Sequence, residues 1–208
     1  MKKTGLILSL VVGMAGAAVA QKDKRAAAVL DAMSARYKSL SAYAAAFTYA
    51  AGSESMKGDL TVKGQKFRLK LAGQEVFNDG KSVSTYVKET NEVNVQDLET
   101  AAGDINPARI YTIYKTGYNY KYVGEQKQGG QPVEVIELTP EKKNTQVARV
   151  QISVNKADKS VKSWKITDKA GKVTSYTITR FTPNPKVTDA FFSFDKARYP
   201  GVEVVDLR

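Results

Sequence analysis

Apolar and polar residues alternate along most of this chain, a pattern typical of β-strands that have one apolar and one polar face. The segment KFRLKL, residues 66–71, is the clearest example, because Phe67, Leu69 and Leu71 alternate with cations. About ten such segments follow one another at regular spacing from residue 44 onward, most of them as hairpins. The pattern therefore predicts a mainly β protein built on one large antiparallel sheet.

Two segments depart from this alternation. Residues 24–43 carry apolar side chains at spacings of three and four, which predicts an amphipathic helix. Residues 107–117 predict a second, shorter helix, because Pro107 suits a first helical position and Gly117 suits a C-terminal cap. The polar segment 96–106 before it has no clear period, and we expect a loop there.

The sheet needs a cover for its apolar face. A sheet of that many twisted strands usually curls or divides into two layers. Two small helices cannot cover the whole face, so the alternatives are a sandwich and a curled sheet with a hollow. The helix at 107–117 carries apolar side chains that need cover, and a mobile helix over the mouth of a curled sheet would meet that need.

The first 20 residues have the layout of a secretory signal peptide. Two lysines precede an apolar run over residues 6–12, and the segment ends with the small residues of Ala18-Val19-Ala20. The apolar run is too short for a membrane anchor. We therefore expect cleavage before Gln21, export, and a single domain over residues 21–208.

The composition argues against most enzyme classes. The chain has no cysteine and no histidine, so it lacks thiolate chemistry, disulfides and the commonest general base and metal ligand. It also lacks the G-x-S-x-G, P-loop and dinucleotide-binding motifs. We expect no enzyme, no metal and no cofactor, with a hydrolase that uses two carboxylates as the remaining enzymatic alternative.

The formal net charge is +11 at pH 7. The lysines are spread over alternating strand positions, as on the solvent-facing side of an amphipathic sheet. A nucleic-acid binder would concentrate them in a patch together with aromatic residues, so we expect no nucleic-acid partner. The charge leaves open an attraction to an anionic membrane surface or an acidic partner.

Several short motifs resemble, in order and spacing, those of the periplasmic outer-membrane lipoprotein carrier proteins, the LolA family. The resemblance covers essentially the whole chain after residue 20. The motifs are FTY at 47–49, GDLTVKGQKFRL at 58–69, NDGKSVSTY at 78–86, INPARI at 105–110, ELTP at 137–140, SWKITDKAG at 163–171, TSYTI at 174–178, FFSF at 191–194 and PGVEVVD at 200–206.

The resemblance implies an unclosed antiparallel β-barrel, a highly curved sheet that encloses an apolar cavity covered by a lid of α-helices. It also implies a monomeric periplasmic carrier that binds the acyl chains of lipoproteins and shuttles them from the inner to the outer membrane. Its partners would be acylated lipoproteins, the inner-membrane transporter that releases them, and an outer-membrane receptor or an anionic membrane surface. Each acyl CH₂ that such a cavity shields from water is worth about 0.8 kcal/mol.

The strand alternation and the lid helix give a set of residues expected to line this cavity. They are Phe47, Leu60, Val62, Phe67, Leu69, Val76, Tyr86, Ile110, Ile113, Tyr114, Trp164 and Ile166. The family's lid-holding arginine corresponds to Gly64, and nearby Arg68 is the candidate substitute for this latch. Tyr49 stands where the family's first-strand motif commonly has glutamine.

Two other interpretations keep the same fold. One is a carrier of another lipid or a glycolipid, for which the basic surface would suit anionic headgroups. The other is a sensor of lipoproteins, or a scaffold, that binds a protein partner and carries no lipid. A sheet interior packed solid by Trp164, Ile166, Tyr176 and Ile178 would favour this last interpretation.

Overall fold

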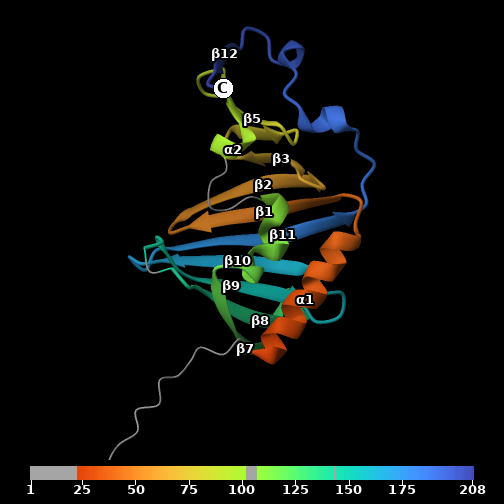
Figure 1. The fold of residues 1–208 in the computed structure, drawn as a ribbon, viewed down its shortest axis with the longest axis vertical. Coiled ribbons are helices and arrows are strands. Elements are labelled where there is room, and N and C mark those ends of the chain that lie inside the picture. The colour runs from red at the N-terminus through yellow and green to blue at the C-terminus, as the bar shows by residue number, and fades with distance from the viewer. Residues whose placement is uncertain (1–22, 102–106, 143) are drawn as a thin grey trace, which may run out of the picture.

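The computed structural model describes residues 23–101, 107–142 and 144–208. Twelve strands form one sheet, and two of the helices, α1 and η1, lie on the same face of it (Figure 1). The helices are α1 Lys24–Ser39, α2 Leu98–Ala101, and the 3₁₀ helices η1 Pro107–Lys115, η2 Asp189–Phe192 and η3 Lys196–Arg198. None of the helices within the described ranges is long and apolar enough to cross a membrane.

The strands divide into two runs. The first half of the chain forms β1 Tyr43–Ala51, β2 Glu54–Lys63, β3 Lys66–Leu71, β4 Gln74–Asn78, β5 Ser82–Val87 and β6 Glu92–Asp97. The second half forms β7 Tyr118–Gln128, β8 Gln131–Pro140, β9 Val147–Asn155, β10 Val161–Asp168, β11 Val173–Pro183 and β12 Glu203–Asp206.

The sheet has the order β12-β6-β5-β4-β3-β2-β1-β11-β10-β9-β8-β7 and does not close. Every neighbouring pair is antiparallel except β12 and β6, which run parallel. The two runs of strands are joined where β1 pairs with β11. The prediction of a mainly β protein with an unclosed antiparallel sheet is therefore confirmed.

Local sequence explains where several elements begin and end. Asp23 caps α1 by accepting hydrogen bonds from the backbone N–H groups of Arg25 at 2.8 Å and Ala26 at 3.2 Å. Two residues, Gly64 and Gln65, connect β2 to β3. Gly64 has φ +60°, a left-handed conformation that suits a tight hairpin turn and disfavours other residues.

Three elements differ from the expected boundaries. The first helix ends at Ser39, and residues 43–51 already belong to β1. The second is a 3₁₀ helix over Pro107–Lys115. The segment expected as a loop begins with the end of β6 and the short helix α2. The predicted signal peptide lies outside the described residues.

The sheet has two distinct faces. We call the face that carries Tyr43, Val62 and Phe67 the inner face, and the opposite one the outer face. These three residues are direct neighbours across β1, β2 and β3, so they project from the same side. The inner face packs against α1 and η1, and part of the outer face packs against the segment that follows β11.

Candidate functional site

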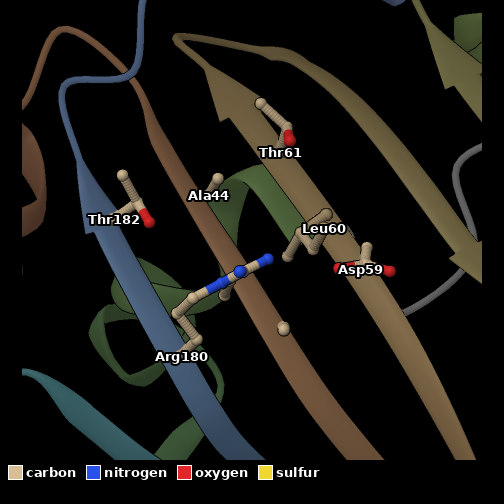
Figure 2. A pocket seen from close by; sticks show the side chains of 8 residues that line it. Ala44, Asp59, Leu60, Thr61, Arg180 and Thr182 are labelled. Atoms are coloured by element: carbon tan, nitrogen blue, oxygen red, sulfur yellow. The ribbon is translucent and has the colours of Figure 1, made fainter.

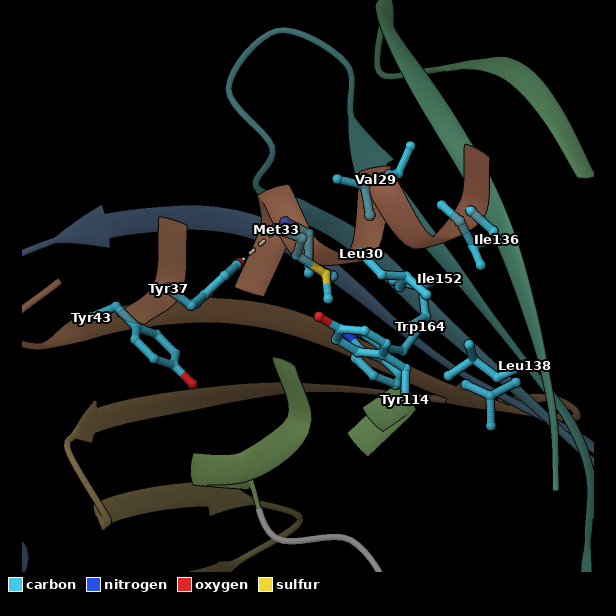
Figure 3. Close-up of a cluster of buried hydrophobic side chains, with 14 of the residues drawn as sticks. Val29, Leu30, Met33, Tyr37, Tyr43, Tyr114, Ile136, Leu138, Ile152 and Trp164 are labelled. Carbon is cyan, nitrogen blue, oxygen red and sulfur yellow. Dashed lines mark hydrogen bonds between the residues drawn. The ribbon is translucent and has the colours of Figure 1, made fainter. Parts of the chain in front are cut away.

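The main apolar cluster lies between the inner face, α1 and η1 (Figure 3). The helix α1 contributes its apolar stripe, and Figure 3 shows Leu30 and Met33 pointing from it toward the sheet. Both side chains have no exposed surface. The lid helix η1 adds Ala108 and Tyr114, which are 3% exposed. The cluster therefore joins three parts of the chain that are distant in sequence.

The sheet's contribution to this cluster follows from its register. Ile136, Ile152 and Trp164 are direct neighbours across β8, β9 and β10, and Tyr176 of β11 continues the row. Ile136 and Ile152 are fully buried, and Trp164 is 6% exposed. This end of the inner face is thus packed tightly beneath α1.

Ten of the twelve residues predicted to line a cavity belong to this cluster or pack against it. Four are buried within it, namely Val62, Phe67, Tyr114 and Trp164. The other six are partly buried against it, namely Leu60, Leu69, Val76, Ile110, Ile113 and Ile166. Their role in lipid binding stays a prediction.

Phe47 also projects from the inner face but lies outside the cluster. It is 6% exposed, and its ring packs over Gly58 and against Tyr176, with the two ring centroids 5.9 Å apart. The ring fits there because residue 58 has no side chain. A β-carbon built on Gly58 would lie 2.7 Å from Phe47 Cε2.

Tyr86 lies on the outer face, contrary to the prediction. Its direct neighbours are Glu75 of β4 and Val93 of β6, whereas Val76 and Thr85 project from the inner face. The Tyr86 ring packs against Tyr199, with centroids 4.5 Å apart, and against Phe194. The segment after β11 covers this part of the outer face and gives the tyrosine an apolar environment there.

Arg68 also projects from the outer face, so it does not hold the lid. It follows Phe67 and precedes Leu69, both of which face inward. Its Nη2 atom lies 2.7 Å from Glu75 Oε2, and its guanidinium lies 4.7 Å and 4.9 Å from the ring centroids of Phe77 and Phe191. Arg68 therefore anchors the segment after β11. Gly64, at the position that corresponds to the family's arginine, faces open space: a β-carbon added there would have no atom of the described residues within 4 Å.

The lid is attached to α1 by aromatic residues instead. Tyr114 donates a hydrogen bond to Asp31 Oδ1 at 2.6 Å. The rings of Tyr111 and Tyr37 are stacked, with centroids 5.6 Å apart. The sequence predicts Tyr114 at this site but not Asp31 or the Tyr111–Tyr37 pair, because nothing in the local pattern links residues about 80 positions apart.

Two of these tyrosines have strongly shifted pKa values. Burial raises the pKa of Tyr37 to about 12, although the N–H of Val161 donates to its hydroxyl at 3.1 Å. Burial, and then the hydrogen bond to the Asp31 carboxylate, raise the pKa of Tyr114. Both side chains therefore stay protonated at neutral pH, and Tyr114 remains a hydrogen-bond donor.

Charged groups lie at the margin of the cluster. Arg25 lies over the Tyr122 ring, 3.8 Å from its centroid, and pairs with Glu125 at 3.0 Å. Lys159 pairs with the buried Glu134 at 2.7 Å. Among the described residues, no group of three or more acidic side chains is placed to hold a metal ion. The site's chemistry is that of an apolar surface.

A small pocket of about 170 Å³ lies on the outer face (Figure 2). Alanine side chains of β1 leave room there, and Arg180 of β11 and Asp59 of β2 flank the space. Figure 2 shows the Arg180 side chain extending across β1 toward β2. This pocket is on the opposite side of the sheet from the apolar cluster and forms no part of it.

Comparisons with known proteins identify the family. The model of the outer membrane lipoprotein carrier protein LolA matches residues 39–195, which is more than half of the chain. The chain belongs to the LolA family. The matched range includes η1 and every strand of the sheet except β12.

Two curated relatives carry the name outer-membrane lipoprotein carrier protein. One, from Cupriavidus pinatubonensis, is 26% identical over 173 residues, and one from Cupriavidus taiwanensis is 27% identical. Each alignment spans 71% of this chain and 80% of the relative. A solved structure of an uncharacterized conserved protein from Thermus thermophilus has a TM-score of 0.62 at 14% identity. The match covers 88% of this chain and 99% of that one, and shows the shared fold.

Proposed function

We propose that this protein is a periplasmic carrier that binds the acyl chains of lipoproteins against the inner face of its sheet, beneath α1 and η1. The observation that carries the proposal is the extent of the apolar surface. It continues from the tightly packed row under α1 to Leu60, Leu69 and Val76, which are only partly buried. Membership of a family named for lipoprotein carriers supports lipoprotein cargo.

The physical basis is the transfer of hydrocarbon out of water. A shielded acyl CH₂ gains about 0.8 kcal/mol, so an acyl chain of ordinary length cannot cross an aqueous compartment unprotected. Displacement of η1 would expose Phe67 and Leu69 together with the lid's own Ile110 and Ile113. An acyl chain that entered there would replace the contacts that the lid had made with the sheet.

The same geometry suits shuttling rather than catalysis. The inner face offers apolar side chains over most of its area, and the charges lie at the margin. We expect the carrier to receive cargo from an inner-membrane releasing transporter and to deliver it at the outer membrane, to a receptor or an anionic surface. Export by the signal peptide and a monomeric state belong to the same proposal.

A release assay tests this function. Protein that begins at Gln21 is incubated with inner-membrane vesicles that hold labelled lipoproteins and the releasing transporter, and the soluble fraction is analysed. We expect label in a soluble complex with the protein. Label that stays in the membrane would contradict lipoprotein carriage. Lipids extracted from the purified protein would then distinguish a carrier of another lipid or glycolipid from a protein-binding sensor.

A further inference from the structure

A buried carboxamide lies at the edge of the apolar cluster. Asn78, the last residue of β4, has no exposed surface. Its direct neighbours across the sheet are Phe67 of β3 and Val83 of β5. Residues directly opposite each other project from the same face with their β-carbons about 5 Å apart. Asn78 therefore shares the inner face with Phe67, which belongs to the cluster.

The two ends of this carboxamide have different partners. Asn78 Oδ1 accepts a hydrogen bond from the backbone N–H of Gly80 at 2.8 Å. Because only the oxygen of an amide can accept from an N–H group, this bond fixes which way the amide lies. The Nδ2 atom is buried and has no hydrogen-bond partner among the residues that the structure describes.

The turn at 78–82 does not need this amino group. The bond to Gly80 uses only the oxygen, and an aspartate would supply the same acceptor. A buried donor without an acceptor destabilises a protein, because it loses its hydrogen bonds with water. A single water molecule would need two or more polar partners, and the cross-strand neighbours Phe67 and Val83 are apolar.

We propose that Asn78 Nδ2 donates a hydrogen bond to the carbonyl oxygen of the ester or amide that joins an acyl chain to the cargo's head group. This inference rests on the proposed function of acyl-chain binding. A carbonyl is an acceptor without a proton of its own, so it matches a lone N–H donor. Asn78 lies at the end of β4, so the chain would extend along the cluster from a head group near the turn at 78–82.

Two lipids that differ only in their carbonyl groups test this contact. One is a glycerol with two sixteen-carbon chains joined by esters, and the other carries the same chains joined by ethers. Each competes with a fluorescent fatty-acid probe for the protein. We expect wild-type protein to bind the ester lipid about five- to tenfold more tightly, the usual size of one hydrogen bond.

Three variants complete the experiment. Asn78→Leu and Asn78→Asp both remove the donor, and Asn78→Asp keeps the acceptor for Gly80, so it serves if the leucine variant fails to fold. Asn78→Leu should bind the two lipids equally, and Asn78→Asp should lose the preference for the ester lipid, because an ionised carboxylate repels a carbonyl oxygen. Asn94→Leu is the matched control, because Asn94 projects from the inner face but its Nδ2 already donates to Glu92 at 2.8 Å. It should keep the wild-type preference.

The outcomes separate this inference from the function on which it rests. Equal affinity of the wild-type protein for the two lipids would overturn the role of Asn78, however the variants fold. A preference that persists in Asn78→Leu would overturn it as well, while leaving acyl-chain binding intact. Failure of the wild-type protein to bind either lipid would instead remove the proposed function, and this inference with it.

Discussion

The hydroxyl of Tyr114 in η1 donates a 2.6 Å hydrogen bond to Asp31 Oδ1 in α1. This bond ties the lid to a helix that is itself packed on the sheet through Leu30 and Met33. It differs in kind from an arginine that binds lid carbonyls, because both partners are side chains on the two helices. Opening of the lid would have to break this bond.

Tyr114→Phe should therefore loosen the lid. The ring stays in the cluster, but the hydrogen bond to a carboxylate is lost, and such bonds contribute about 1.5 kcal/mol or more. We expect backbone amide hydrogen exchange in residues 110–115 to rise about tenfold. Tyr111→Phe is the control, since it keeps the ring stacked on Tyr37. Equal exchange in the two variants would show that the Asp31 bond does not hold the lid.

Leu69→Glu should abolish lipid uptake while leaving the protein folded. The new carboxylate would lie on the inner face beside Leu60 and Val76, where it opposes an apolar chain. Thr61→Glu is the control, because Thr61 projects from the outer face opposite Arg68. Uptake is measured with a fluorescent fatty acid, and folding by circular dichroism. Normal uptake by Leu69→Glu would place the lipid elsewhere.

Gly58→Ala should destabilise the sheet through overlap with its neighbours. The added methyl group would lie 2.9 Å from the backbone oxygen of Lys70 and would overlap the Phe47 ring. We expect the free energy of unfolding to fall by about 1–3 kcal/mol in urea titrations. Combining it with Phe47→Leu should cost less than the sum of the single changes, because the smaller side chain relieves part of the overlap. Strict additivity would contradict this explanation.

Arg68→Met should weaken the attachment of the segment after β11. The Arg68 side chain is 7% exposed and pairs with Glu75, whose side chain is 20% exposed. Burial alone would raise the pKa of Glu75, but hydrogen bonds from Arg68 and Lys70 outweigh it and lower this pKa. We expect a loss of about 2 kcal/mol in unfolding free energy, less than for a fully buried pair. Lys70→Met, at a side chain 49% exposed, should change stability by less than about 0.5 kcal/mol.

The carboxyl group of Asp189 should stay ionised at unusually low pH. Hydrogen bonds from Lys63 and Lys66, each at 2.8 Å, lower its pKa to about 2. The pKa of Asp189 in the folded protein lies below that of an unfolded aspartate, about 3.9. The ion pairs therefore contribute their full stabilisation above about pH 3.9. It is lost as the pH falls toward 2. The carboxyl carbon followed by NMR should titrate near pH 2, and Lys63→Met should move the midpoint upward. An unchanged midpoint would contradict the pairing.

The alternation of residues predicted the inner face of β2 and β3 well and that of β5 poorly. In β3, cations separate Phe67, Leu69 and Leu71, so one face is plainly apolar. In β5, both faces carry apolar or aromatic side chains, because the outer face there is covered by Phe194 and Tyr199. A segment more than 100 residues away supplies that cover, and no local pattern in β5 indicates it.

The latch could not be predicted from the sequence for a related reason. Arg68 is the arginine nearest to Gly64 in the sequence, but its place between Phe67 and Leu69 already assigns it to the opposite face. Asp31 and Tyr114 meet only because α1 and η1 pack on the same face of the sheet. Their pairing depends on tertiary structure, which residue spacing along either helix does not encode.

The pairing of β1 with β11 has a consequence for how the chain folds. It joins residues 43–51 to residues 173–183, so one edge of β1 stays without its partner until nearly the whole chain is present. Contacts so distant in sequence carry a large loop-closure entropy and are associated with slow folding, on the order of milliseconds to seconds. During that interval the hairpin of β1 and β2 presents an open hydrogen-bonding edge and the bare apolar side of Tyr43 and Val62. We therefore expect the unfolded chain to be prone to aggregation along that edge until β11 pairs with β1.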